Sequence, residues 1–155
     1  MTIATRLARA EDAPQIHRLT QQAFEEYRGQ LLPPSSAHDE TEAVVAQALR
    51  EGGAVLALEH DEPVGAARFA HRPDHLYVGR VSVPPERRGQ GIAVALMQAL
   101  EHQARRLGVP AIELQVRESL PSNVRLYQKL GYVVIRREPH PRNPDFVSLR
   151  MRKDV

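Results

Sequence analysis

The middle of the chain holds three strand patterns in succession, and the longest helical pattern of the sequence follows them. Short apolar runs alternate with turn-forming residues, and the runs lie at residues 54–59, 64–69 and 76–83. This arrangement predicts an antiparallel meander. From Gln90 to about Leu107 apolar residues recur at helical spacing, and Gly108 follows as a stop signal. A meander that leads into a helix and another strand implies a mixed sheet covered by helices.

The flanking segments complete a βααβββαβαββ order. Before the meander, the patterns predict a strand at residues 3–8 and helices at 11–27 and 41–50. After the long helix, they predict a strand at 111–116, a helix at 122–130, and strands at 132–136 and 146–151, with a loop at 138–145. The expected fold class is α+β with α/β/α layers, in which four helices cover a mixed, mostly antiparallel sheet of about seven strands.

Length and composition indicate one domain over residues 1–155. The chain has 155 residues, of which 42% are hydrophobic, as in an ordinary globular domain. No apolar run reaches the roughly 18–20 residues that cross a bilayer, and the N-terminus lacks the layout of a signal peptide. The absence of Cys excludes disulfides, thiolate metal sites and Cys nucleophiles. We therefore expect a cytoplasmic protein that does not bind membranes.

Arginine supplies almost all of the positive charge, because Lys occurs only at Lys129 and Lys153. Arg favours contacts with phosphate or carboxylate, although an Arg-rich sequence can equally reflect genome composition. The net charge is only +2, aromatic residues make up 5% of the chain, and no basic block is interleaved with them. We therefore expect no nucleic-acid partner.

A glycine-rich segment between the third meander strand and the long helix carries the strongest functional signal. It reads Val81-Ser82-Val83-Pro84-Pro85-Glu86-Arg87-Arg88-Gly89-Gln90-Gly91-Ile92-Ala93. Free N–H groups at a helix start form a site for an anion such as pyrophosphate. Gly89 and Gly91 lack a Cβ, so phosphates can approach the backbone closely. Arg87 and Arg88 add positive charge at the same place.

Two other phosphate-binding loops fit this segment poorly. A Walker A motif ends in Gly-Lys-Ser/Thr, which the sequence lacks. The dinucleotide-binding fingerprint needs a third glycine, and this chain has Val94 at that position. That fingerprint also needs an early βαβ unit, whereas the segment lies in mid-chain after a meander.

The segment resembles the phosphopantetheine loop of the GNAT superfamily of acyl-CoA N-acyltransferases. Arg88-x-x-Gly91-x-Ala93 matches the Arg/Gln-x-x-Gly-x-Gly/Ala signature, and the element order extends the resemblance over essentially the whole chain. The resemblance implies a GNAT-like fold with acetyl-CoA as co-substrate and no metal. It also implies a set of residues that bind coenzyme A: Val81, Ser82, Val83, Arg87, Arg88, Gly89, Gln90, Gly91, Ile92 and Ala93.

A later segment strengthens the resemblance. Leu120-Pro121-Ser122-Asn123-Val124-Arg125-Leu126-Tyr127, with Gly131-Tyr132 after it, resembles the superfamily helix that carries a Tyr before a Gly-aromatic pair. The resemblance places Tyr127 near the coenzyme A sulfur, where a phenol protonated at neutral pH can serve as general acid. An ordinary core tyrosine is the alternative. The superfamily commonly has Asn where this chain has Leu120, but Asn123 matches a recurrent variant and is expected to face the cofactor.

The acceptor side carries no comparable motif. The resemblance indicates a substrate loop at residues 27–36, and the loop predicted at 138–145 is a second candidate, although both could be ordinary surface connections. Tyr27, Arg28 and His140 are the candidate substrate residues. His71 and His75 flank a turn without a third nearby ligand, so no metal site is predicted.

The resemblance implies direct transfer, in which a neutral amine attacks the thioester and a backbone N–H near Val83 stabilises the oxyanion. The general base stays open among Glu40, Glu113, Glu118, His38 and His140. The leading prediction is an N-acetyltransferase that acetylates a primary amine of a small molecule or peptide. A non-catalytic acyl-CoA-binding module on the same fold is the alternative. The resemblance also implies a homodimer.

Overall fold

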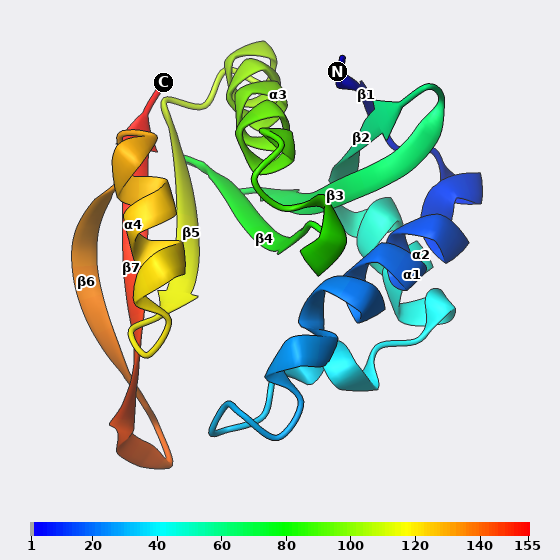
Figure 1. The fold of residues 1–155 in the computed structure, drawn as a ribbon. Coiled ribbons are helices and arrows are strands. Elements are labelled where there is room, and N and C mark those ends of the chain that lie inside the picture. The colour runs from blue at the N-terminus through cyan, green and yellow to red at the C-terminus, as the bar shows by residue number, and fades with distance from the viewer. Residues whose placement is uncertain (1) are drawn as a thin grey trace.

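The computed structural model describes residues 2–155, which form a seven-stranded sheet with helices packed against it (Figure 1). The strands are β1 (Ala4–Leu7), β2 (Gly53–Glu59), β3 (Glu62–His71), β4 (Leu76–Ser82), β5 (Ala111–Arg117), β6 (Val133–His140) and β7 (Asn143–Asp154). The helices are α1 (Ala13–Phe24), α2 (Glu42–Glu51), α3 (Ile92–Arg106) and α4 (Pro121–Lys129). The predicted βααβββαβαββ order is confirmed. Within the described residues, no helix is long and apolar enough to cross a membrane.

The sheet is mixed, as predicted. Its strand order is β1-β2-β3-β4-β5-β7-β6. Across residues 2–155, β4 and β5 are the only parallel neighbours, and the other pairs are antiparallel. The parallel pair follows from the connection through α3, because two parallel strands need a crossover of at least a dozen residues.

Two hydrophobic cores lie on opposite faces of the sheet. Leu56 of β2 belongs to the core that contains Ile16 of α1 and Val45 of α2. Its neighbour Val55 belongs to the other core, with Leu96 of α3 and residues of α4. Successive side chains of a strand point to opposite faces, so one strand serves both cores. This produces the α/β/α layers that the sequence predicted.

The two strands β4 and β5 pair along only part of their length. Their parallel register covers Leu76 to Val78 of β4, opposite Ile112 to Leu114 of β5. Beyond this stretch, β4 stays with β3 and β5 stays with β7, so the two halves of the sheet part like a V (Figure 1).

A bulge in β4 accompanies this separation. The register between β3 and β4 shifts between Ala66 and Arg68, and Arg80 on the bulged strand has a φ of 50°. A bulge bends a strand and increases its twist. The end of β4 therefore turns away from β5, and the gap between them opens at residues 79–82.

Gly65 of β3 determines how closely α3 approaches the sheet. A Cβ at this position would lie 2.6 Å from Cγ2 of Ile92, the first residue of α3. Glycine in a strand commonly marks such a close approach. The absence of a side chain at Gly65 thus allows the N-terminus of α3 to sit against the open end of the sheet.

The prediction of a loop at residues 138–145 is wrong. β6 continues through His140 and β7 begins at Asn143, so the segment is the end of a β-hairpin. Pro139 is tolerated because β6 is an edge strand. Pro144 precedes Ser148, the residue at which the pairing of β7 with β5 begins, so it lies where the hairpin extends past β5.

Candidate active site

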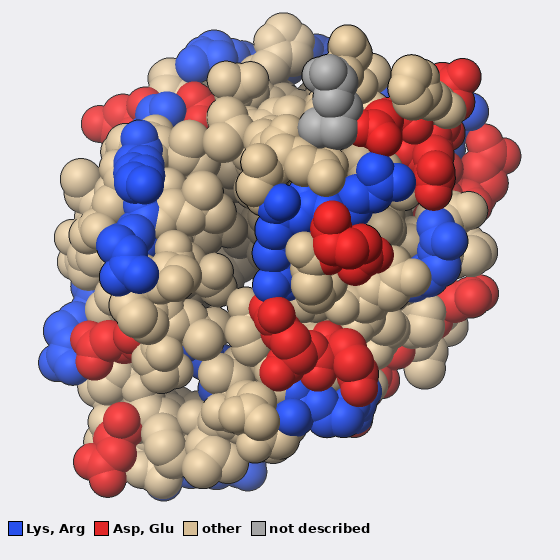
Figure 2. Space-filling model, in the orientation of Figure 1, with Lys and Arg blue, Asp and Glu red and all other residues tan. Residues whose placement is uncertain are grey.

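A cleft of about 1540 Å³ opens where β4 and β5 part. Figure 2 shows the molecule hollowed at this place, with blue Lys and Arg side chains along one edge of the hollow. Sites for one small ligand are commonly about 300–1,000 Å³. The cleft is lined by the end of α1, the loop after it, β4, the start of α3, β5, α4 and the β6–β7 hairpin. Its size is therefore sufficient for two substrates.

The N-terminus of α3 faces this cleft with free backbone donors. Gly89 and Gly91 have φ values of 77° and 81°, and a Cβ on either would meet no atom within 4 Å. The first helical hydrogen bond runs from the Ala95 N–H to the Gly91 carbonyl, and no side chain caps the helix. The N–H groups of residues 92–94 thus have no intrahelical partner, and all three residues line the cleft. Free N–H groups at a helix N-terminus are suited to an anion.

The two arginines before these glycines are held by protein carboxylates. Arg87 donates to Glu59 at 3.0 Å. Arg88 binds Glu26 and also donates to the carbonyls of Ala23 and Val83, at 3.2 Å each. These contacts fix the loop to the end of β2, to the end of α1 and to Val83, just after β4. The local capacity to bind an anion therefore comes chiefly from backbone N–H groups.

The predicted residues at and just after the end of β4, and Gln90, differ in whether they line the cleft. Val81 and Val83 line the cleft, whereas Ser82 and Gln90 do not. The Ser82 hydroxyl is buried, where it donates to the Arg80 carbonyl at 2.9 Å. Alternation along the strand explains this pattern.

Tyr127 lies in α4 with its ring buried at the cleft wall. It is 7% exposed and packs edge-to-face on Tyr132, with ring centroids 6.0 Å apart. Burial raises the pKa of the Tyr127 phenol well above its ordinary value, and Tyr27 adds to the shift. The hydroxyl therefore stays protonated across the physiological range.

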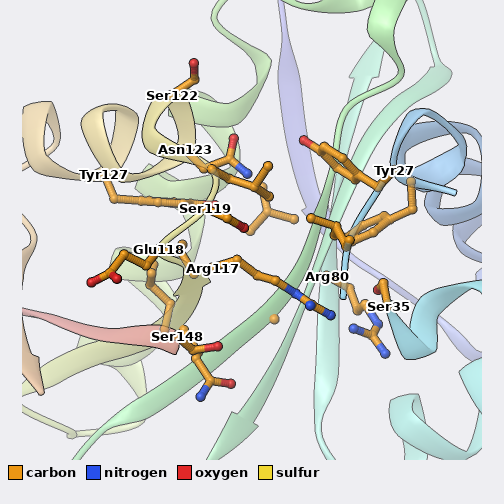
Figure 3. Close-up of a pocket in the computed structure, with 18 of the residues that line it drawn as sticks. Tyr27, Ser35, Arg80, Arg117, Glu118, Ser119, Ser122, Asn123, Tyr127 and Ser148 are labelled. Carbon is orange, nitrogen blue, oxygen red and sulfur yellow. The ribbon is translucent and has the colours of Figure 1, made fainter. Parts of the chain in front are cut away.

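Asn123 and Tyr27 face one another across the cleft (Figure 3). Burial raises the pKa of Tyr27, and the Asn123 amide partly opposes this change. The two side chains come from α4 and from the segment after α1, which are far apart in the sequence. The structure thus brings three predicted site residues, Tyr27, Asn123 and Tyr127, to one cleft.

The other predicted substrate residues differ in their placement. His140 lines the cleft, and its Nδ1 accepts a hydrogen bond from the Arg142 N–H at 3.1 Å. Arg28 is exposed, does not line the cleft, and pairs with Glu25 at 3.1 Å.

Among the carboxylates considered as bases, only Glu118 lines the cleft. Arg137, 2.9 Å away, lowers the pKa of the Glu118 carboxyl through its hydrogen bonds. Glu40 lies beneath the cleft wall, held by Arg68 at 2.7 Å and by Arg80 at 3.2 Å.

The remaining base candidates, Glu113 and His38, lie outside the cleft lining. Glu113 forms a group with Asp74 and His75 whose potential ligand atoms lie within 4.8 Å of one another. Arg152 is 2.8 Å from Glu113 and 3.5 Å from Asp74, so a guanidinium already balances both carboxylates. This arrangement is an ion-pair network near the start of β5, outside the cleft lining.

No sequence motif marks two arginines of the cleft. Arg80 of β4 and Arg117 of β5 both line the cleft, and Figure 3 shows their guanidinium groups converging beside Ser35. Each is an arginine at the end of a strand, which is an ordinary pattern in a sequence. The separation of β4 and β5 gives the pair its position, and no motif marks it.

Known proteins resemble this chain along most of its length. Residues 14–132 match the family described as Acetyltransferase (GNAT) family. An acetyltransferase of Pectobacterium atrosepticum is 40% identical over 65 residues, which are 42% of this chain and 44% of that protein. The chain therefore aligns with less than half the length of this curated relative.

Solved structures share the fold. The PaiA N-acetyltransferase of Thermoplasma acidophilum, in complex with coenzyme A, aligns with a TM-score of 0.83 and 16% identity over 100% of both chains. Ard1 from Thermoplasma volcanium aligns with a TM-score of 0.80 and 19% identity, over 100% of this chain and 99% of its own. At these identities, the likeness concerns the fold alone.

Proposed function

We propose, since this chain belongs to the GNAT family of acetyltransferases, that it transfers an acetyl group from acetyl-CoA to a primary amine. The observation that carries this proposal is the uncapped N-terminus of α3, with two open positive-φ glycines, at the cleft where the sheet parts. Free N–H groups there suit the pyrophosphate of coenzyme A.

The rest of the donor fits the cleft from this anchor. Beyond its pairing with β5, β4 presents a strand edge along Val81 to Val83, to which the pantetheine amides can hydrogen-bond. Tyr127 lines the same cleft farther from the loop. A related fold, that of PaiA, is known in complex with coenzyme A.

The proposed reaction is direct attack. The amine nitrogen forms a bond to the thioester carbonyl carbon, and the carbonyl oxygen becomes an oxyanion that the Val83 N–H can stabilise. The carbon–sulfur bond then breaks, and the thiolate takes a proton from the Tyr127 hydroxyl, which its burial keeps protonated. The proton of the amine leaves to water or to Glu118 or His140, the two base candidates that line the cleft.

Thiol release from acetyl-CoA in the presence of a panel of primary amines tests the proposal. Tyr127→Phe should reduce kcat sharply and leave coenzyme A affinity nearly unchanged. Tyr132→Phe is the matched control, because Tyr132 packs on Tyr127, its own hydroxyl is buried without a partner, and it does not line the cleft. Tight coenzyme A binding without turnover of any amine would favour the non-catalytic module instead.

A further inference from the structure

The arginines that line the cleft differ in whether a carboxylate of the protein balances their charge. Among residues 2–155, four guanidinium groups line it, from Arg80, Arg87, Arg88 and Arg117. The first three contact the carboxylates of Glu40, Glu59 and Glu26, respectively. Within the described chain, no carboxylate lies within 4.0 Å of Arg117, whose one hydrogen bond goes to the Pro33 carbonyl. Arg117 therefore holds a positive charge that the protein itself does not balance.

The surroundings of Arg117 make this charge costly. Its side chain is half-buried, and burial lowers its pKa, as does the charge of Arg80. An arginine nevertheless stays charged in a protein. Its five N–H donors form a fork that matches a planar anion, and only one protein acceptor engages them. A bound anion would relieve the repulsion between the two guanidinium groups.

The position of Arg117 assigns this anion to the acceptor. Arg117 ends β5, and its guanidinium contacts Pro33 in the loop that follows α1. Arg80 reaches the same loop through the Ser36 hydroxyl at 2.7 Å. The proposed pyrophosphate site lies elsewhere in the cleft, at residues 89–93 on the N-terminus of α3. Figure 3 shows Arg117 directed at Arg80 and Ser35, below Asn123 and Tyr27.

We propose that the acceptor amine also carries a carboxylate, which Arg117 binds through its guanidinium fork with Arg80 beside it. The substrate class is therefore that of amino acids or other amino carboxylates, with the amine directed toward the thioester. This inference rests on the proposed acetyl transfer. The guanidinium of Arg117, which has no carboxylate partner among the described residues, distinguishes this cleft from a pocket that would accept any amine.

Matched acceptor pairs test the inference. The rate of thiol release is measured with a panel of amino acids, with their primary amides, and with O-phosphoethanolamine. Removing a charged hydrogen-bond pair commonly costs about ten- to a hundredfold in equilibrium constants. We expect kcat/KM to favour each productive acid over its amide by about this factor. Arg117→Gln should lower kcat/KM for the acid by a similar factor and leave that for the amide unchanged.

Two further variants keep the test specific. Arg117→Lys should recover part of the preference for the acid, because it restores the charge without the fork. Arg106→Gln is the control, since Arg106 is exposed at the end of α3 and does not line the cleft. It should leave the ratio between acid and amide unchanged.

The possible failures differ from one another. If no amine is acetylated, the proposed function fails. If amides are acetylated as well as acids, or O-phosphoethanolamine is preferred, acetyl transfer stands and the carboxylate assignment is overturned. If Arg117→Gln weakens coenzyme A binding in calorimetry as much as it weakens acid turnover, Arg117 belongs to the donor site, which also overturns it.

Discussion

Gly91 and Gly108 stand at opposite ends of α3 and share one backbone conformation. Gly91 caps the N-terminus with a φ of 81°, and Gly108 follows the C-terminus with a φ of 74°. A Cβ on either would meet no atom within 4 Å. A side chain at either position thus carries the same left-handed penalty, about 1–2 kcal/mol, and no clash. Only Gly91 lines the cleft.

Comparing Gly91→Glu with Gly108→Glu distinguishes an effect on stability from an effect on ligand binding. The shared strain should lower the Tm of both variants by roughly 2–8 °C, since 1 kcal/mol corresponds to about 2–4 °C for a chain of this size. The helix dipole favours a carboxylate at the N-terminus and disfavours one at the C-terminus. Gly91→Glu should therefore be the more stable of the two, so a loss of ligand binding in it is not a consequence of unfolding.

Binding should change in Gly91→Glu alone. Its carboxylate would occupy the space proposed for pyrophosphate and repel the phosphates. Losing two charge-assisted hydrogen bonds, each worth about 1.5–3 kcal/mol, corresponds to at least a hundredfold weaker coenzyme A binding, roughly. Calorimetric titration with coenzyme A measures this, and circular dichroism gives the two melting curves. A coenzyme A affinity that survives Gly91→Glu, or an equal loss in Gly108→Glu, would refute the placement of the pyrophosphate.

Two further predictions concern stability. Gly65→Ala places a methyl group 2.6 Å from Cγ2 of Ile92 and should cost about 1–3 kcal/mol in thermal unfolding. Gly79→Ala, with its nearest atom 4.0 Å away, should change little, so similar losses would contradict the packing argument. The hydrogen bond from Arg6 holds the pKa of the Asp12 carboxyl below its ordinary value, so the stability it provides is present above about pH 3.9 and is lost as pH falls through the lower folded pKa. In urea unfolding, Asp12→Asn should have a lower free energy of unfolding at pH 7, and this free energy should fall less steeply below about pH 4 than in the unchanged protein. An equally steep fall below pH 4 in both proteins would refute this.

The fold could be predicted from the sequence because its signals are local. The meander depends on apolar runs with turns between them, and α3 depends on one periodic apolar face that ends at Gly108. The proposed anion site also depends on nearby residues of one segment, since Gly89 and Gly91 provide a backbone conformation that leaves space for a ligand. The element order of the structure is the predicted one, and the match over residues 14–132 shows the family.

The end of the last hairpin could not be predicted in this way. Three prolines lie within residues 138–145, and prolines so close together in a sequence indicate a loop. Whether a proline interrupts a strand depends on whether a neighbour needs its N–H, which is a property of the whole sheet. Pro139 lies on an edge strand and Pro144 lies past the end of β5. The strands therefore extend through both.

The proposed donor and acceptor sides of the cleft differ in the same respect. The donor loop is continuous in sequence, whereas Arg80 and Arg117 are brought together by a bulge in one strand and the early end of its pairing with the next. A change in the loop after α1, which contacts both arginines, can thus alter the acceptor without disturbing the donor site. In our proposal, Arg117, whose charge no carboxylate among residues 2–155 balances, carries more information about the substrate than the motif that identifies the family.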